Sequence, residues 1–238
     1  MRSDCSCSRC DVAGLRPDLG YANQGDLKSL DPDTLNETTT HAHLGQVYEG
    51  LNARDKDLKI VPALAESWET PEPTRWRFHL RHGIKFQNGD PFTADDVVFS
   101  AERVRAKGSN LQSSIDPDVK VVKIDDYTVD FVLTKPNPIL NSQWDTWYIM
   151  DKKWCEENNS VAPTPASATT PTYASLHANG TGAFTVESHQ PCPTGWSRRA
   201  SKDYLNRSAE NGAGSANGAS PVIISASSRP DTGPSVSP

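Results

Sequence analysis

Histidine and cysteine side chains are the groups in this sequence whose spacing could support metal chemistry. His41 and His43 form an H-x-H pair, and Cys5, Cys7 and Cys10 lie close together near the first residue. A closed zinc site needs four ligands, and no further set of ligands follows either group at a suitable spacing. We interpret the histidines as surface or helix-capping residues and predict no metal, although a metal-dependent enzyme stays open as an alternative.

Motifs of nucleophilic and phosphate chemistry are missing from the chain. The sequence contains no G-x-S-x-G, no P-loop and no H-E-x-x-H. Two pairs of acids, 95–96 and 125–126, resemble the paired carboxylates of acid–base catalysis. A helix start, where acids suit the positive end of the helix dipole, and a hairpin turn account for them. We therefore predict neither an enzyme nor a cofactor.

Three aromatic side chains close together are the pattern most typical of ligand binding. Trp144, Trp147 and Tyr148 lie within five residues, and Trp154 follows nearby. Such a group can line an apolar pocket. The alternative is a loop that packs its aromatic side chains onto a sheet, and the sequence alone does not separate the two.

Charge and hydropathy exclude several classes of protein. Residues 21–190 hold 16 Lys and Arg against 24 Asp and Glu, a net charge of −8, and an acidic body without a basic stripe argues against nucleic-acid binding. No apolar run approaches the roughly 18 residues that a membrane span requires. The first 20 residues lack the apolar core of a secretory signal, so the sequence as written predicts a cytoplasmic chain. Five cysteines, unevenly placed, do not suggest a disulfide framework.

The elements that must position any site are predicted by local patterns. Alternation of apolar and polar residues predicts two hairpins, one joining Trp68 to 76–80 across a loop of more than two residues, the other joining 119–124 to 129–133. Residues 83–86 are predicted as a further short strand. Thr93 and the two acids after it predict a helix start, and the fold class is α+β. Apolar residues at helical spacing predict another helix after Thr40 that ends near Gly50: Leu44, Val47, Tyr48 and Leu51.

A run of short phrases follows along the chain: 27–32 (LKSLDP), 47–51 (VYEGL), 62–68 (PALAESW), 78–81 (FHLR) with 83–86 (GIKF), 92–100 (FTADDVVFS), 122–129 (VKIDDYTV) with 131–135 (FVLTK), and 180–184 (GTGAF). In this order and at these distances, the phrases resemble the dipeptide, oligopeptide and nickel-binding family (family 5) of solute receptors that serve bacterial ABC importers. The resemblance covers about residues 19–190, and the run of phrases is more specific than any one of them.

The resemblance implies a two-lobed periplasmic-binding-protein-like fold that closes around a solute and passes it to a membrane permease. It implies an extracytoplasmic, periplasmic place for the family. In peptide-binding relatives the segment after L-D-P lies against the ligand backbone, which here falls on Asn36, Glu37, Thr38 and Thr39. Extended backbone there can pair with a peptide as an added strand does. The aromatic residues at 144, 147 and 148 are further candidates.

The resemblance also implies a division of the chain. Residues 21–50 begin the first lobe, 51–175 form an α+β subdomain and 176–190 return to the first lobe, whereas the second lobe is missing. Residues 1–20 are expected to be a non-native or disordered leader. In 192–238, 26 of 47 residues are Gly, Ala, Ser or Pro, so 191–238 is predicted to be a disordered tail.

We therefore expect an N-terminal fragment of a receptor for peptides or similar solutes. Because one lobe cannot clamp a ligand, weak or absent binding is expected of this chain. The alternative is a truncated or frameshifted product with no ligand binding.

Overall fold

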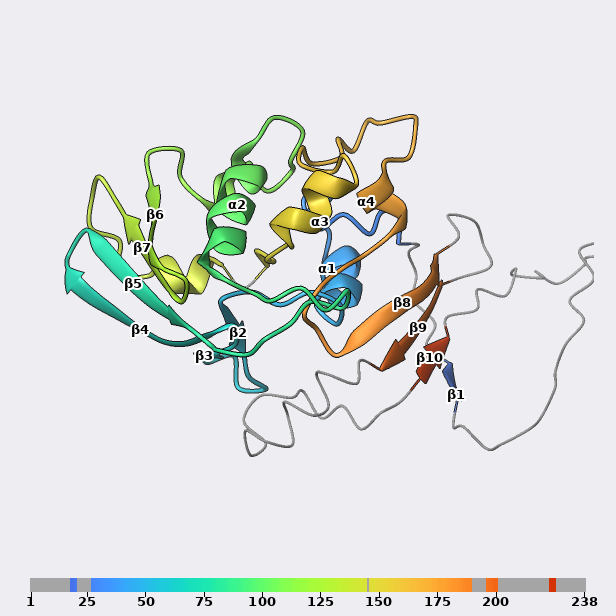
Figure 1. Ribbon diagram of the computed structural model, residues 1–238, viewed down its shortest axis with the longest axis horizontal. Helices are drawn as coiled ribbons and strands as arrows, with labels where there is room; N and C mark the ends of the chain where they lie inside the picture. Colours follow the sequence, from blue (N-terminus) through green and yellow to red (C-terminus); the bar gives the residue numbers. More distant parts are fainter. Residues whose placement is uncertain (1–17, 21–26, 145, 190–195, 201–222, 226–238) are drawn as a thin grey trace, which may run out of the picture.

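The computed structural model describes residues 18–20, 27–144, 146–189, 196–200 and 223–225, which form three β-sheets and several short helices (Figure 1). The strands are β1 (Asp18–Gly20), β2 (Asn52–Arg54), β3 (Ile60–Pro62), β4 (Ala65–Glu72), β5 (Arg75–Leu80), β6 (Lys120–Asp125), β7 (Thr128–Val132), β8 (Phe184–His189), β9 (Trp196–Ala200) and β10 (Ile223–Ser225). The helices are α1 (Thr38–Leu44), α2 (Ala94–Arg105), α3 (Lys152–Glu157) and α4 (Tyr173–Leu176), with 3₁₀ turns η1 (Gln112–Ser114) and η2 (Leu140–Gln143). None of the described helices is long and apolar enough to cross a membrane.

Both predicted hairpins are confirmed, and they form one antiparallel sheet in the order β4-β5-β7-β6. Alternation on β5 places Trp76, Phe78 and Leu80 in the interior while the residues between them face outward. The connection between β4 and β5 is shorter than predicted, because β4 continues through Glu72 and β5 begins at Arg75. The mixed helix and sheet content agrees with the predicted α+β class.

Helix α2 covers the inner face of this sheet and begins where the sequence predicts (Figure 1). The Asp96 carboxylate accepts a hydrogen bond from the Thr93 backbone N–H (2.9 Å) through Oδ2. Through Oδ1 it accepts a second bond, from the Lys152 backbone N–H (3.0 Å). Asp96 therefore stabilises the starts of α2 and α3 together, because both have backbone donors without partners inside the helix.

An Asp96→Ala substitution is expected to lower the free energy of unfolding by about 1–2 kcal/mol, because two backbone donors lose their acceptor. Urea denaturation measures this loss. The exposed neighbour Asp95 provides the control, and Asp95→Ala is expected to change stability less. Equal losses in the two variants would show that the bonds of Asp96 contribute nothing specific.

Two hydrophobic cores meet at α2. The first holds the inner face of the β4–β7 sheet with Val97 and Val104 of α2, and the second holds α1, α3 and α4 with Phe99. The extended segment 147–150 serves both cores by alternation. Trp147 and Ile149 belong to the first core, whereas Tyr148 and Met150 belong to the second. Because both cores pack against α2, this helix fixes how the elements of one core are placed relative to those of the other.

The first helix lies earlier than predicted. It spans Thr38–Leu44 and ends at Gly45, rather than following Thr40 and ending near Gly50. Val47 and Tyr48 come after it in a turn, where their backbone N–H groups donate to the Leu44 carbonyl at 2.9 and 2.8 Å. That turn keeps both side chains buried. The apolar residues therefore continue at helical spacing in the sequence although the helix has ended.

Two further predictions differ from the structure. Residues 83–86 form only one isolated bridge, between Lys85 and Pro91, because hydrogen bonds from Phe86 to Asp90 and from Gly89 to Phe86 close a tight loop. The described parts of the predicted tail are strands, β9 and β10, which join β8 and β1 in the sheet order β1-β10-β9-β8. The rest of that tail and residues 1–17 lie outside the described residues. The division at 50, 175 and 190 stays a prediction.

Candidate functional site

The segment of residues 35–39 leads into α1: residues 35–37 precede the helix, whereas Thr38 and Thr39 are its first two residues and are not extended as predicted. Asn36, Glu37 and Thr38 are exposed and Thr39 is half-buried, and Glu37 has extended backbone angles, φ −121° and ψ 138°. Within the described part of the chain, the backbone N–H and C=O groups of Leu35 and Asn36 and the N–H of Glu37 make no hydrogen bond. These groups are therefore available to an extended partner.

The turn of residues 31–34 holds the segment at its N-terminal end. Asn110, just beyond α2, donates its backbone N–H to the Asp33 carbonyl (2.9 Å). The Asn110 side chain donates to the Thr34 carbonyl (2.8 Å). One residue, Leu35, separates this fixed turn from Asn36. The start of the segment is thus attached to the region that follows α2.

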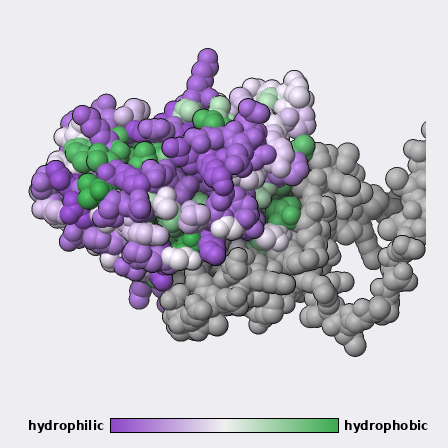
Figure 2. Space-filling view, in the orientation of Figure 1, coloured by the Kyte–Doolittle hydropathy of each residue, from purple (hydrophilic) through white to green (hydrophobic). Residues whose placement is uncertain are grey.

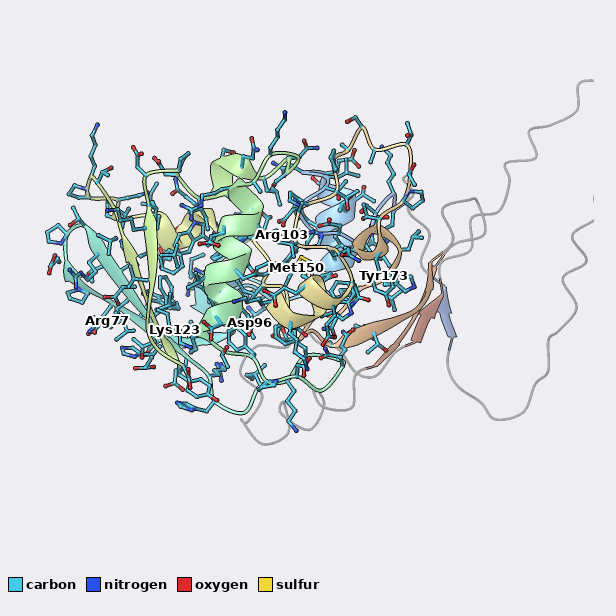
Figure 3. All side chains as sticks on the ribbon, turned by 45° about the horizontal axis from the view of Figure 1, so that its top comes forward. Arg77, Asp96, Arg103, Lys123, Met150 and Tyr173 are labelled. Atoms are coloured by element: carbon cyan, nitrogen blue, oxygen red, sulfur yellow. The ribbon has the colours of Figure 1, made fainter. Side chains whose placement is uncertain are left out.

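A buried ionic cluster attaches the same turn to α2 itself. The Arg103 guanidinium donates two parallel bonds to the Asp31 carboxylate, at 2.8 and 2.7 Å, and a short third bond to Asp33. Its Nε donates to the Ser160 carbonyl (3.1 Å), and Asp31 also accepts from the Thr164 backbone N–H (2.8 Å). Arg103, labelled in Figure 3, lies on the side of α2 towards α1 and α3. We name residues 31, 33 and 103 the Arg103 cluster.

The Arg103 cluster carries one cation and two carboxyl groups, and all three side chains are nearly inaccessible to water. Burial raises the pKa of Asp33 to about 7, a shift that Arg103 opposes and Asp31 reinforces. Burial also acts to raise the pKa of Asp31, but the charge and hydrogen bonds of Arg103 hold it below its usual range. Burial raises the pKa of the nearby Cys155 thiol to about 12, so that group is neutral. The second carboxyl group, on Asp33, is consequently the one that gains a proton near neutral pH.

The raised pKa of Asp33 predicts a specific pH dependence of stability. Between pH 4 and 7 the folded chain holds a proton on Asp33 that the unfolded chain, with a pKa near 3.8, has released. The contribution of Asp33 to the free energy of unfolding therefore decreases as pH rises through this window. An Asp33→Asn variant should lack that decrease, so its stability relative to wild type should improve from pH 5 to pH 8.

Denaturation of both proteins across this range measures the difference. Asp96, whose pKa burial raises to about 6, titrates in both proteins and cancels. A stability difference that stays constant with pH would contradict the assignment of the proton to Asp33.

Contacts from α1 and from residue 148 hold the other end of the segment. The His41 backbone N–H donates to the Glu37 carbonyl (3.0 Å), and His41 Nε2 lies 3.1 Å from Asn36 Oδ1. The Tyr148 hydroxyl donates to the His41 carbonyl (3.2 Å). Tyr148 is thus the one predicted aromatic residue among 144, 147 and 148 that the structure brings towards the predicted backbone segment.

The other two predicted aromatic residues lie in the first core. Trp144 and Trp147 are fully buried, with ring centroids 5.4 Å apart in an edge-to-face arrangement. Trp144 also donates its indole N–H to the Ser114 carbonyl (2.9 Å). Their surroundings here correspond to loop packing on the sheet, and a role in ligand contact stays a prediction for all three aromatic residues.

The described residues contain no group of three or more His, Cys, Asp or Glu side chains placed to hold a metal. His41 contacts Asn36, and His43 Nδ1 lies 2.7 Å from the Thr39 carbonyl, so both histidines contact the segment 35–39. Cys5, Cys7 and Cys10 lie outside the described residues.

The sequence interpretation missed the Arg103 cluster. Asp96, Ser100 and Arg103 recur at helical spacing and look like the solvent face of α2, yet all three are buried against the second core. The acid of the L-D-P phrase, Asp31, was the available signal, but pairing it with a residue 72 positions away required the fold.

Comparison with known proteins places these features in a family. The model of "Bacterial extracellular solute-binding proteins, family 5 Middle" matches residues 59–214. The chain is 34% identical over 137 residues to the periplasmic oligopeptide-binding protein OppA of Haemophilus influenzae, a match that covers 49% of this chain and 25% of the relative. It is 30% identical over 199 residues to the dipeptide-binding protein of Escherichia coli, covering 72% of this chain and 35% of the relative.

Solved structures show the same fold. OppA of Listeria monocytogenes bound to peptide superposes with a TM-score of 0.71 at 20% identity, over 90% of this chain and 43% of that chain. The binding protein MoaA in complex with mannopinic acid, from Agrobacterium tumefaciens, superposes with a TM-score of 0.70 at 26% identity, over 89% and 41%. The chain spans about a quarter of the length of the first curated relatives it matches. The fold is that of periplasmic binding proteins, and the chain belongs to the bacterial extracellular solute-binding proteins of family 5.

Proposed function

We propose that this chain supplies one side of a solute site in an ABC-importer receptor, and that the solute is a short peptide. Membership of family 5 and similarity to oligopeptide- and dipeptide-binding proteins support a receptor of this kind. The segment 35–39 is the proposed contact surface. It includes the four residues that the family resemblance assigns to the ligand backbone: Asn36, Glu37, Thr38 and Thr39.

The observation that carries the proposal is the set of unpaired backbone groups at residues 35–37. Asn36 and Glu37 are exposed, Leu35 is half-buried, and Glu37 has extended backbone angles. Both neighbouring parts of the chain, the turn 31–34 and α1, are held by hydrogen bonds. A peptide that lies antiparallel or parallel to this stretch can exchange N–H···O=C bonds with it, as an added strand does. Backbone recognition of this kind accepts many side-chain sequences, which suits a receptor for mixed peptides.

The proposed role is binding and delivery without catalysis. In this role the receptor works outside the cytoplasmic membrane, in the periplasm, and transfers its solute to a membrane permease that a separate ATPase drives. The proposed partners are therefore a small solute and the permease. Closure of a second lobe over the segment would complete the site by a hinge motion.

An Asn36→Pro substitution tests the backbone pairing. Proline removes the N–H donor at this exposed position, so affinity for a fluorescent tripeptide should fall about tenfold, the effect of losing one well-formed hydrogen bond. Fluorescence polarisation measures this affinity. The matched control is Asn36→Ala, which removes the side chain but keeps the N–H, and its affinity should stay close to wild type.

The two variants separate the candidate mechanisms. Equal loss in both would assign recognition to the Asn36 side chain rather than to the backbone. Unchanged affinity in Asn36→Pro, with its fold confirmed by circular dichroism, would remove the segment from the site.

A further inference from the structure

The Arg103 cluster connects α2 to the turn that precedes the proposed peptide segment, and its hydrogen bonds fix the orientation of that turn. Arg103 binds Asp31 through two parallel bonds, and the planar fork of a guanidinium fixes direction as well as distance. Asn110 adds two bonds to the same turn from the chain just after α2. All of these attachments lie within five residues of Asn36.

Stability alone does not account for such a cluster. Two carboxyl groups and one guanidinium are removed from water here, and the desolvation of buried ion pairs offsets most of their mutual attraction. Well-packed apolar residues of similar size would stabilise this site about as well. An apolar contact, however, tolerates sliding, whereas a bidentate ion pair allows one register.

The position of the unpaired backbone depends on this register. Residues 35–37 make no backbone N–H bonds of their own in the described structure. Their position is set by the turn before them and by α1 after them. A shift of the turn by a fraction of a hydrogen-bond length would therefore misalign the N–H and C=O groups offered to a peptide.

From this geometry we infer that Arg103, Asp31 and Asp33 are positioning residues: they hold residues 35–37 in register with the peptide backbone without touching the peptide. The inference rests on the proposed function, because it concerns the same segment. It assigns the cluster a role in solute affinity in addition to folding.

An Arg103→Lys substitution tests the inference. Lysine keeps a cation beside the two carboxyl groups, so we expect the fold to be retained, but it cannot form the parallel pair of bonds. The matched control is Arg77→Lys. Arg77 makes the same kind of bidentate pair with Asp130, at 2.7 and 2.8 Å, on the sheet and away from Arg103 (Figure 3).

Amide hydrogen exchange reports the positioning directly, because it needs no peptide. In Arg103→Lys, exchange of the Asn110 and His41 amides, which bond to Asp33 and Glu37, should accelerate roughly tenfold or more through local opening. Amides of the β5–β7 ladder should be unchanged, and tripeptide affinity should fall about tenfold. Arg77→Lys should alter neither the two reporter amides nor the affinity.

The outcomes separate this inference from the proposed function. If wild type binds no peptide, the proposed function fails, yet faster exchange at Asn110 and His41 would still support positioning of the segment. If Arg103→Lys binds and exchanges like wild type, positioning is overturned while the proposed function stands. Uniformly faster exchange across the whole chain would show a role in global stability only and would also overturn the inference.

A second variant covers the case in which Arg103→Lys does not fold. Asp33→Asn keeps the bidentate pair between Arg103 and Asp31 intact. It should accelerate exchange at Asn110 and weaken tripeptide binding in the same direction, by a smaller factor. Unchanged exchange and binding in Asp33→Asn would then count against the inference.

Discussion

Replacing Arg103 by leucine is expected to lower the free energy of unfolding by about 3–5 kcal/mol. The substitution removes the only cation within the Arg103 cluster and leaves Asp31 and Asp33 buried beside each other. Donors lost to the Ser160 and Ala162 carbonyls add to the effect. Because a domain is stable by about 5–15 kcal/mol in total, this one change should remove a large part of the stability.

Urea denaturation of Arg103→Leu against wild type measures this loss. The control is Lys107→Leu, which makes the same kind of replacement at an exposed position just beyond α2. It should leave the denaturation midpoint nearly unchanged. If both variants lose the same small amount, the carboxyl groups of the cluster are hydrated in solution and their ion pair with Arg103 is not buried.

Replacing Gly180 by alanine is the second change with a large expected effect. A Cβ atom at Gly180 would lie 2.0 Å from the Val47 carbonyl oxygen, and backbone atoms cannot move aside as a flexible side chain can. The close approach matters because Gly182 donates to Val47 (2.9 Å) and Phe184 donates to Gln46 (3.0 Å) across it. The expected loss exceeds the ~1–3 kcal/mol typical of overpacking.

Gly83→Ala is the control for this substitution. Gly83 has a positive φ of 72° but open space around it, so alanine there adds only backbone strain of about 1–2 kcal/mol. The account therefore predicts a larger loss at Gly180 than at Gly83, in the same denaturation assay. The reverse order would show that the return segment 180–184 does not lie against residues 46–47.

Local sequence patterns predicted those elements whose signals are complete within a few residues. The β4–β5 and β6–β7 hairpins were predictable because alternation alone decides which side chains face the interior. The start of α2 was predictable because Thr93 and Asp96 form a reciprocal cap within one turn. The first helix was placed too late, because a hydrogen-bonded turn after Leu44 continues the apolar spacing without continuing the helix.

Buried contacts between segments far apart in the sequence could not be predicted from local patterns. Helix α2 is buried on two sides, so its polar stripe, which includes Arg103, has the appearance of a solvent-facing surface. Trp144 and Trp147 pack in one core while Tyr148, beside them, reaches α1. The aromatic residues separate because successive side chains of the segment 147–150 point alternately into the two cores. The second core is formed by segments far apart in the sequence, so a local pattern does not reveal it.

Exposed apolar side chains mark places where a ligand could bind outside the segment 35–39. The face shown in Figure 2 is mainly hydrophilic, and some of its apolar patches lie towards the β6–β7 end of the sheet. Val122 and Ile124 of β6 are among the exposed apolar side chains. This end of the sheet is therefore one place to look for binding that does not involve the segment 35–39.

A titration of the isotope-labelled chain with a tripeptide, followed by amide chemical shifts, tests the central claim most directly. It detects weak contacts and assigns them to residues. The account predicts that the largest shifts fall on the amides of Leu35, Asn36 and Glu37, with smaller shifts at His41. Shifts confined to β6, or no shifts at millimolar peptide, would contradict the claim that this segment binds the peptide backbone.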